Sequence, residues 1–326
     1  MQIIKKIFSI VLRVGISAAL LFILFRKIDF KSTLIVISHL NFGYFTFAAV
    51  IFLAIYALVF YRWRMLLKAQ DLNLPTSRIL SSFSGGIFFS LFLPSTIGGD
   101  VARTLDLSLH TKKRSVVAAS VLLDRLSGFV GLVLVAIVSL IFGHKLIVEP
   151  EVYFVVLILS ALLAAVLLII FNKRIYKRLN RKIHKDGSFW DNFRKLHAEI
   201  FFFRSQPSIL YLNLLYSILI QSGSSVVAYF LLRSLNVKIH IIYPLVFSPV
   251  ITVITTLPVS IGGLGLRDAS SIFFYTKVGV LKNVALAQSL LNFALIVATG
   301  LIGGIIYVST FHYRRLQPDQ TGAQPE

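Results

Sequence analysis

Residues 93–103 read LPSTIGGDVAR, and residues 257–267 read LPVSIGGLGLR. The two segments share Leu, Pro, Ile, both Gly and Arg at six of eleven aligned positions, so the chain contains an internal repeat. Each ends an apolar run, at 79–93 and at 241–257, that is shorter than the roughly 20 residues a helix needs to cross a bilayer. Short apolar segments broken by Gly or Pro at corresponding places in two halves of a membrane protein indicate a transport site.

The composition is that of a membrane protein. Of the 326 residues, 57% are hydrophobic and 14% charged, and the mean hydropathy is +0.84, whereas a soluble domain has about 25% charged residues. Six apolar runs are long enough to span the hydrocarbon core, at 7–25, 42–61, 115–142, 152–171, 208–232 and 284–311. The sequence therefore predicts an all-α, polytopic integral membrane protein with six full transmembrane helices.

Basic residues orient these helices. Ten of the 33 Lys and Arg residues fall within 173–204, among only three acidic residues. The positive-inside rule places such a loop in the cytoplasm, where it attracts anionic lipid headgroups. Nucleic-acid binding would instead require aromatic residues interleaved with basic ones on a folded platform, so we expect no nucleic-acid partner.

The position of this loop fixes the rest of the topology. Arg62, Arg64 and Lys68 then fall in another cytoplasmic loop. The first LPxxIGG segment must enter the membrane from the cytoplasm and return there, whereas the second must enter and leave from the outside. The sequence thus predicts two re-entrant broken helices of opposite orientation, which is the pattern of an inverted repeat, with both termini in the cytoplasm.

We expect one membrane domain over 1–312 and a short polar tail over 313–326. The parts of the membrane domain are a first repeat half at about 42–142, a connector helix at 152–171, a basic cytoplasmic loop at 172–207 and a second repeat half at about 208–311. The connector is the odd span that permits the inversion between the two halves.

The residue types at the two hairpin tips suit an anion. Pro94 and Pro258 each end a helix, because proline lacks the backbone N–H that the helix needs. The Gly pairs accept a positive φ and let a ligand or another backbone come close. Free N–H groups at the start of the returning limb attract an anion, and Arg103 or Arg267 would complete the site. The alternative is an ordinary Gly/Pro turn at the membrane surface, with the Arg side chain reaching for water.

A second polar group lies within the span from Ser115 to Phe142. Asp124 and Arg125 are about 14 to 15 Å into this span, near the middle of the bilayer, at about 1.5 Å per residue. Charge is costly at that depth and indicates a functional site, although a purely structural ion pair is the alternative. The candidate partners of Asp124 are Arg103, Arg125 and Arg267. The helical stripe around it is small and polar, with Ser120, Ser127 and Gly131.

Three ordered motifs carry a family resemblance. GGDVAR at 98–103, LLDRLSG at 122–128 and PVSIGGLGLRD at 258–268 resemble the transmembrane domain of lysylphosphatidylglycerol synthase and its stand-alone, flippase-like relatives. The resemblance covers nearly the whole chain, although Asp124 and Asp268 stand where Glu is more usual. The motifs and the hairpin tips together give the candidate substrate-binding residues Pro94, Gly98, Gly99, Asp100, Arg103, Asp124, Arg125, Pro258, Gly262, Gly263, Gly265, Arg267 and Asp268.

The resemblance implies a lipid flippase in the cell membrane. Full-length synthases carry a further soluble domain that transfers lysine to phosphatidylglycerol, so we expect this chain to be no enzyme and to have no catalytic residues. A basic, re-entrant cavity suits a lipid with an anionic phosphate head, such as an aminoacylated phospholipid or a polyprenyl phosphate. Because Cys is absent and the seven His residues are scattered, we expect no metal and no other cofactor.

Two other functions fit part of the pattern. An integral-membrane transferase acting on a lipid-linked substrate is one, although its early extracytoplasmic loop would offer only Asp29 as an acid. An ion-coupled transporter of a small solute is the other, because it would share the inverted repeat. Acyl or prenyl tails beside the cavity would favour a lipid, whereas a site closed to the lipid phase would favour a small solute.

The predicted topology can be tested by labelling single cysteines, because the chain contains no Cys of its own. Asp186→Cys, in the basic loop, should react with a membrane-impermeant maleimide only after the cells are permeabilised. Glu149→Cys, in the turn predicted outside, is the matched control and should react in intact cells. Labelling of the first variant from outside intact cells would reverse the orientation.

Overall fold

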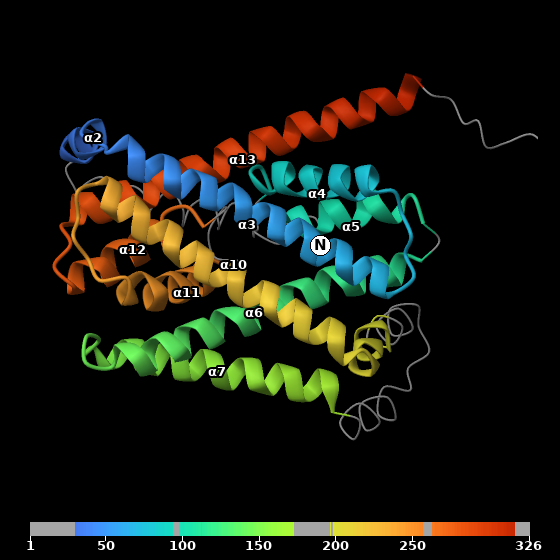
Figure 1. Ribbon diagram of the computed structural model, residues 1–326, viewed down its shortest axis with the longest axis horizontal. Helices are drawn as coiled ribbons and strands as arrows, with labels where there is room; N and C mark the ends of the chain where they lie inside the picture. The colour runs from blue at the N-terminus through green and yellow to red at the C-terminus, as the bar shows by residue number, and fades with distance from the viewer. Residues whose placement is uncertain are drawn as a thin grey trace, which may run out of the picture.

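The computed structural model describes residues 30–93, 98–111, 113–172, 196, 198–256 and 263–316, with the backbone alone for 311–316. Every regular element in these residues is helical, which confirms the predicted all-α class. The elements are α2 (Phe30–Ser38), α3 (Phe42–Ala69), α4 (Thr76–Ser90), α5 (Gly98–Ser108), α6 (Arg114–Gly143), α7 (Pro150–Phe171), the 3₁₀ turn η1 (Phe203–Ser205), α10 (Pro207–Ser234), α11 (Ile242–Thr256), α12 (Leu266–Lys277) and α13 (Lys282–Leu316). Figure 1 shows an elongated bundle in which the long helices run along the long axis.

Five of the described helices are long and apolar enough to cross a membrane. They are α3, α6, α7, α10 and the Lys282–Thr310 part of α13. Each overlaps one predicted span, and the sixth predicted span, 7–25, lies outside the described residues. The protein is therefore a multi-pass membrane protein by its helix composition.

One predicted boundary is wrong. Helix α3 continues to Ala69, so Arg62, Arg64 and Lys68 lie on a helix and not in a loop. The physical reason is that Arg62 and Trp63 are buried in protein, with 5% and 0% of their surface exposed, and their polar groups have partners there. Arg62 therefore does not end the span formed by α3, because polar groups of other helices stabilise its charge.

The four short helices form two neighbouring pairs. Helix α4 packs on α5, and α11 packs on α12. Figure 1 shows the two pairs at opposite ends of the bundle, with α4 and α5 to the right and α11 and α12 to the left. Each pair also contacts the long helix that follows the other pair, because α4 packs on α13 and α11 packs on α6. The predicted tips at 94–97 and 257–262 lie outside the described residues.

Helices α3 and α10 pack along each other, and α6 packs on both. Helix α7, the predicted connector, packs along α6 at one side of the bundle and buries little of its own surface (Figure 1). The end of the predicted loop 172–207 is partly helical and ordered against the bundle. Phe203 in η1 is fully buried, and it joins Leu66 of α3 and Leu123 of α6 in one apolar cluster. Apolar packing thus extends to the end of the long helices.

Small residues let several helices come into direct contact. A Cβ added to Gly131 of α6 would lie 2.7 Å from the backbone carbonyl carbon of Ser217 on α10. A Cβ added to Gly303 of α13 would lie 2.8 Å from the carbonyl oxygen of Ser84 on α4. Real Cβ atoms do not approach backbone atoms so closely, and helices in membranes use small residues in this way.

We expect Gly131→Ala to destabilise the protein by about 1–3 kcal/mol, as overpacking does in a filled interior. The reason is that the obstructing atoms belong to the backbone of Ser217 and cannot rotate away. Gly128→Ala on the same helix is the matched control, since the nearest atom to its added Cβ, Nη1 of Arg62, is 3.8 Å away. The measurement is Tm in detergent, and an equal Tm for both variants would contradict the close contact of α6 and α10.

Candidate functional site

Asp124 lies at the centre of a buried ion network. Its Oδ1 accepts a hydrogen bond from Nε of Arg62 on α3 at 2.7 Å, and its Oδ2 accepts one from Nη2 of Arg103 on α5 at 2.9 Å. Asp124 is 3% exposed and Arg103 is 5% exposed. One carboxylate of α6 thus ties a long helix and a short helix together. Arg103 was among the predicted partners of Asp124, and Arg62 was not.

Asp100, in the first turn of α5, is the second acid of the network. Its Oδ1 forms an ion pair with Nη2 of Arg103 at 3.0 Å, and its Oδ2 accepts a hydrogen bond from Nε of Arg125 on α6. Arg103 therefore bridges two carboxylates. Three guanidinium groups face two carboxylates, so these five side chains carry a formal charge of +1. The Arg125 side chain is 40% exposed and forms the open edge of the network.

Neighbouring groups hold the two buried Arg side chains in place. Nη1 of Arg62 donates to Oγ of Ser217 on α10 at 2.9 Å. The guanidinium of Arg103 stacks on the Trp63 ring, 4.7 Å from its centre, and the indole N–H of Trp63 donates to Oγ of Ser120 at 3.1 Å. Nε of Arg103 is buried and has no hydrogen-bond acceptor in the described part of the chain. A buried donor without an acceptor is uncommon and invites a ligand-based explanation.

The second repeat places Arg267 and Asp268 at the start of α12. Oδ2 of Asp268 accepts the backbone N–H of Gly265 at 3.0 Å, which caps the helix. Its Oδ1 accepts from Oγ of Ser289 on α13 at 2.5 Å and lies 3.4 Å from Nη2 of Arg267. Nε of Arg267 donates to Ser289 at 3.1 Å, and its guanidinium stacks on Phe293 at 4.9 Å. The repeated Arg is thus paired with an Asp and stacked on an aromatic ring in both halves.

The glycines of the two repeats differ in what they do. Gly263 and Gly265 both have φ of 77°, which agrees with the predicted need for positive φ. Gly98 and Gly99 instead begin α5 as helical residues, and Gly99 packs against the carbonyl of Gly86 on α4. The candidate residues outside the described part of the chain are Pro94, Pro258 and Gly262.

The two repeated Arg residues belong to separate clusters. Arg103 contacts groups of α3, α5 and α6, whereas Arg267 contacts groups of α12 and α13. Among the described residues, no hydrogen bond or ion pair connects one cluster to the other. In the same residues, no three His, Asp or Glu side chains gather as a metal site would require.

Sequence reasoning missed several members of the site. Arg62 and Trp63 stand in the segment YRWR at 61–64, which follows the apolar run 42–61 and therefore predicts the end of a span. The available signal was helical spacing, because extending the helix places Arg62 and Leu66 on one face. Ser217, Ser289 and Phe293 gave no such signal, since each is a single ordinary residue of a long apolar helix.

We expect Asp124→Asn to lower the free energy of unfolding by about 3–5 kcal/mol, because it leaves two buried guanidinium groups without their shared carboxylate. Asp124→Glu is the control, since it keeps the charge, and it should lose less. The measurement is Tm in detergent at fixed pH. A wild-type Tm for Asp124→Asn, together with the loss of any pH dependence of transport, would identify a protonation switch instead.

One protein-family model matches most of the chain. The family model described as "Lysylphosphatidylglycerol synthase TM region" matches residues 10–304, which include both repeats and both Arg clusters. Comparison with curated proteins gave no match. The match is to the membrane region, and no synthase catalytic domain is found in the chain. As its motifs predicted, the chain belongs to the family of the lysylphosphatidylglycerol synthase transmembrane region.

Proposed function

We propose that this protein moves an anionic lipid between the two leaflets of the cell membrane. The lipid is of the aminoacylated phospholipid or polyprenyl phosphate type. The family match supports a role in handling such lipids, and five candidate spans provide the membrane setting. In this proposal both termini and the loop 172–207 face the cytoplasm, and the protein acts as a transporter and not as an enzyme.

The observation that carries the proposal is the excess positive charge around Asp124. A formal charge of +1 shared by five side chains, four of them largely buried, is costly inside a membrane protein. A phosphodiester headgroup would bring the missing negative charge. Arg125, at the open edge, is the group that would meet the lipid first, and Nε of Arg103 is a donor without an acceptor among the described residues.

Arg is suited to this task because of its shape. Its planar guanidinium donates two parallel hydrogen bonds to phosphate oxygens, which the ammonium of Lys does not. In both repeats the Arg is already held by an Asp and an aromatic ring, with ring distances of 4.7 Å for Arg103 and 4.9 Å for Arg267. Such support fixes the orientation of the guanidinium before the lipid arrives.

We further propose that the pairs α4–α5 and α11–α12 are re-entrant and enter from opposite sides of the membrane. Their positions at opposite ends of the bundle and their reciprocal contacts with α13 and α6 support this arrangement (Figure 1). In an inverted repeat, motion of one half relative to the other exposes a central site to each side in turn. Arg103 and Arg267 would then face one cavity during the transport cycle and hold the phosphate.

The two alternative functions predict different outcomes in a lipid-transport assay. A transferase acting on a lipid-linked substrate would form a product, and an ion-coupled transporter would move a water-soluble solute and leave lipids in place. Reconstituting the purified protein in vesicles with a panel of fluorescent lipids separates them. Lipid scrambling without a chemical change supports the proposal, whereas no scrambling of any anionic lipid would remove it.

We expect Arg103→Lys and Arg267→Lys each to slow this scrambling about tenfold or more, the effect of losing one charge-assisted hydrogen bond. Tm should fall less than for Asp124→Asn, because Lys keeps the positive charge beside each Asp but loses the stacking and part of the hydrogen bonding. Arg233→Lys is the control, since Arg233 also stacks on a ring, that of Tyr44 at 5.4 Å, outside both clusters. Unchanged scrambling in the double variant would exclude these residues as phosphate ligands.

A further inference from the structure

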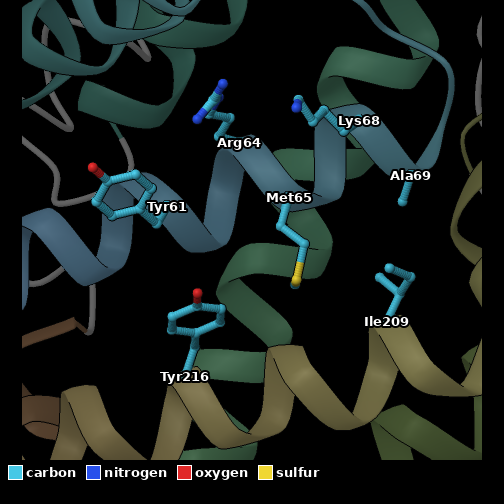
Figure 2. A pocket seen from close by; sticks show the side chains of 7 residues that line it. All are labelled: Tyr61, Arg64, Met65, Lys68, Ala69, Ile209 and Tyr216. Atoms are coloured by element: carbon cyan, nitrogen blue, oxygen red, sulfur yellow. The ribbon is translucent and has the colours of Figure 1, made fainter.

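A cavity of about 420 Å³ lies between α3 and α10, apart from the buried network. Figure 2 shows its lining: Arg64 and Lys68 extend from one side of α3, while Met65 lies between the two helices. Tyr216 and Ile209 line it from α10. The cavity therefore has a cationic side and an apolar side.

The cationic side of the cavity carries groups that can bind an anion. Arg64 and Lys68 are one helical turn apart, and none of the described residues that line the cavity is acidic. Nε of Arg64 is buried and has no hydrogen-bond acceptor among the described residues. The hydroxyl groups of Tyr61 and Tyr216 are further donors at the same cavity. These groups would bind a phosphate by charge-assisted hydrogen bonds.

The apolar side continues along the surface of α10. Ile209, Leu212 and Tyr216 follow one another at helical spacing, so they share a face of the helix. Leu212 is 42% exposed, and a lipid chain would cover it. A water-soluble anion has no apolar chain that would cover this stripe.

The cavity lies where the ends of two candidate spans meet. Arg64 and Lys68 are in the last two turns of the candidate span Phe42–Ala69, and Ile209 is near the start of the candidate span Pro207–Ser234. Lys, Arg and Tyr concentrate where spans leave the hydrocarbon core. The charge pattern of the sequence places this end in the cytoplasmic leaflet.

The cavity is distinct from the network around Asp124, although the same two helices build both. Arg62 and Ser217 contact each other inside the protein at 2.9 Å. Arg64 and Tyr216, their near neighbours in sequence, face the cavity. Each helix thus presents one face to the network and another to the cavity.

We propose that this cavity is a docking site for an anionic phospholipid. The phosphate lies between Arg64 and Lys68, and one acyl chain lies along Ile209, Leu212 and Tyr216. The site binds its lipid whether or not the protein transports lipids, so it goes beyond the function proposed above.

The test is native mass spectrometry of the full chain in detergent with added phosphatidylglycerol or phosphatidylcholine. Arg64→Gln combined with Lys68→Gln should weaken phosphatidylglycerol binding roughly tenfold and leave phosphatidylcholine binding unchanged. Lys113→Gln combined with Arg114→Gln is the matched control, because it removes the same charge from exposed residues at the start of α6. Equal binding by the wild type and the first variant, or equal weakening by the control, would overturn the proposal.

Two further arms complete the test. Glycerophosphoglycerol, the same headgroup without acyl chains, should not displace the lipid at equal concentration, and displacement would show that the site takes a free phosphate ester. Lys68→Gln alone changes an exposed residue and should weaken binding several-fold even where the double variant folds poorly. The measurement needs no transport, so its failure leaves the proposed flippase function untouched.

Discussion

The pairing of one buried carboxylate with two guanidinium groups constrains the whole arrangement. A charge inside a membrane protein must find partners, because neither lipid nor the apolar interior can solvate it. Asp124 of α6 meets this need with Arg62 of α3 at 2.7 Å and Arg103 of α5 at 2.9 Å. The short helix α5 is consequently held to α6 by an ion pair and by packing, and to α3 by the stacking of Arg103 on Trp63. Movement of α5 away from α6 would break the ion pair between Arg103 and Asp124. A phosphate bound to Arg103 would then take the place of the Asp124 carboxylate.

The two repeats pair their buried Arg residues with acidic groups in different ways. In the second repeat, Asp268 caps its own helix and pairs with the adjacent Arg267, so that cluster is neutral by itself. In the first repeat, the acids and bases come from three helices, and one positive charge remains in excess. An anion therefore gains more at the cluster of Arg103 than at that of Arg267. The sequence motifs are alike in the two halves, but the net charges of the two clusters differ.

Much of this fold could be predicted from the sequence, because apolar runs report directly on spans. Interrupted runs likewise indicated the short helices, and the Gly residues of the second repeat indicated positive φ, found at Gly263 and Gly265. Helical spacing could have extended the helix past Arg62, but the partner of Arg62 could not be predicted, since Asp124 lies 62 residues further along the chain. An Arg at the end of an apolar run is normally interfacial, and only a tertiary partner reverses that expectation. The helical start of α5 at Gly98 depends in the same way on packing against α4.

The last turns of α3 show why a count of basic residues describes a membrane protein poorly. Residues 62, 63, 66 and 67 are buried, whereas 61, 64, 65 and 68 lie on the more open face, as helical periodicity requires. Arg62 is buried and shares the carboxylate of Asp124 with Arg103, so it belongs to the buried network. Arg64 and Lys68 lie on the more open face and line the cavity. The position of a cation on the helix face, and not its place in the sequence, decides whether it holds the protein together or meets the membrane.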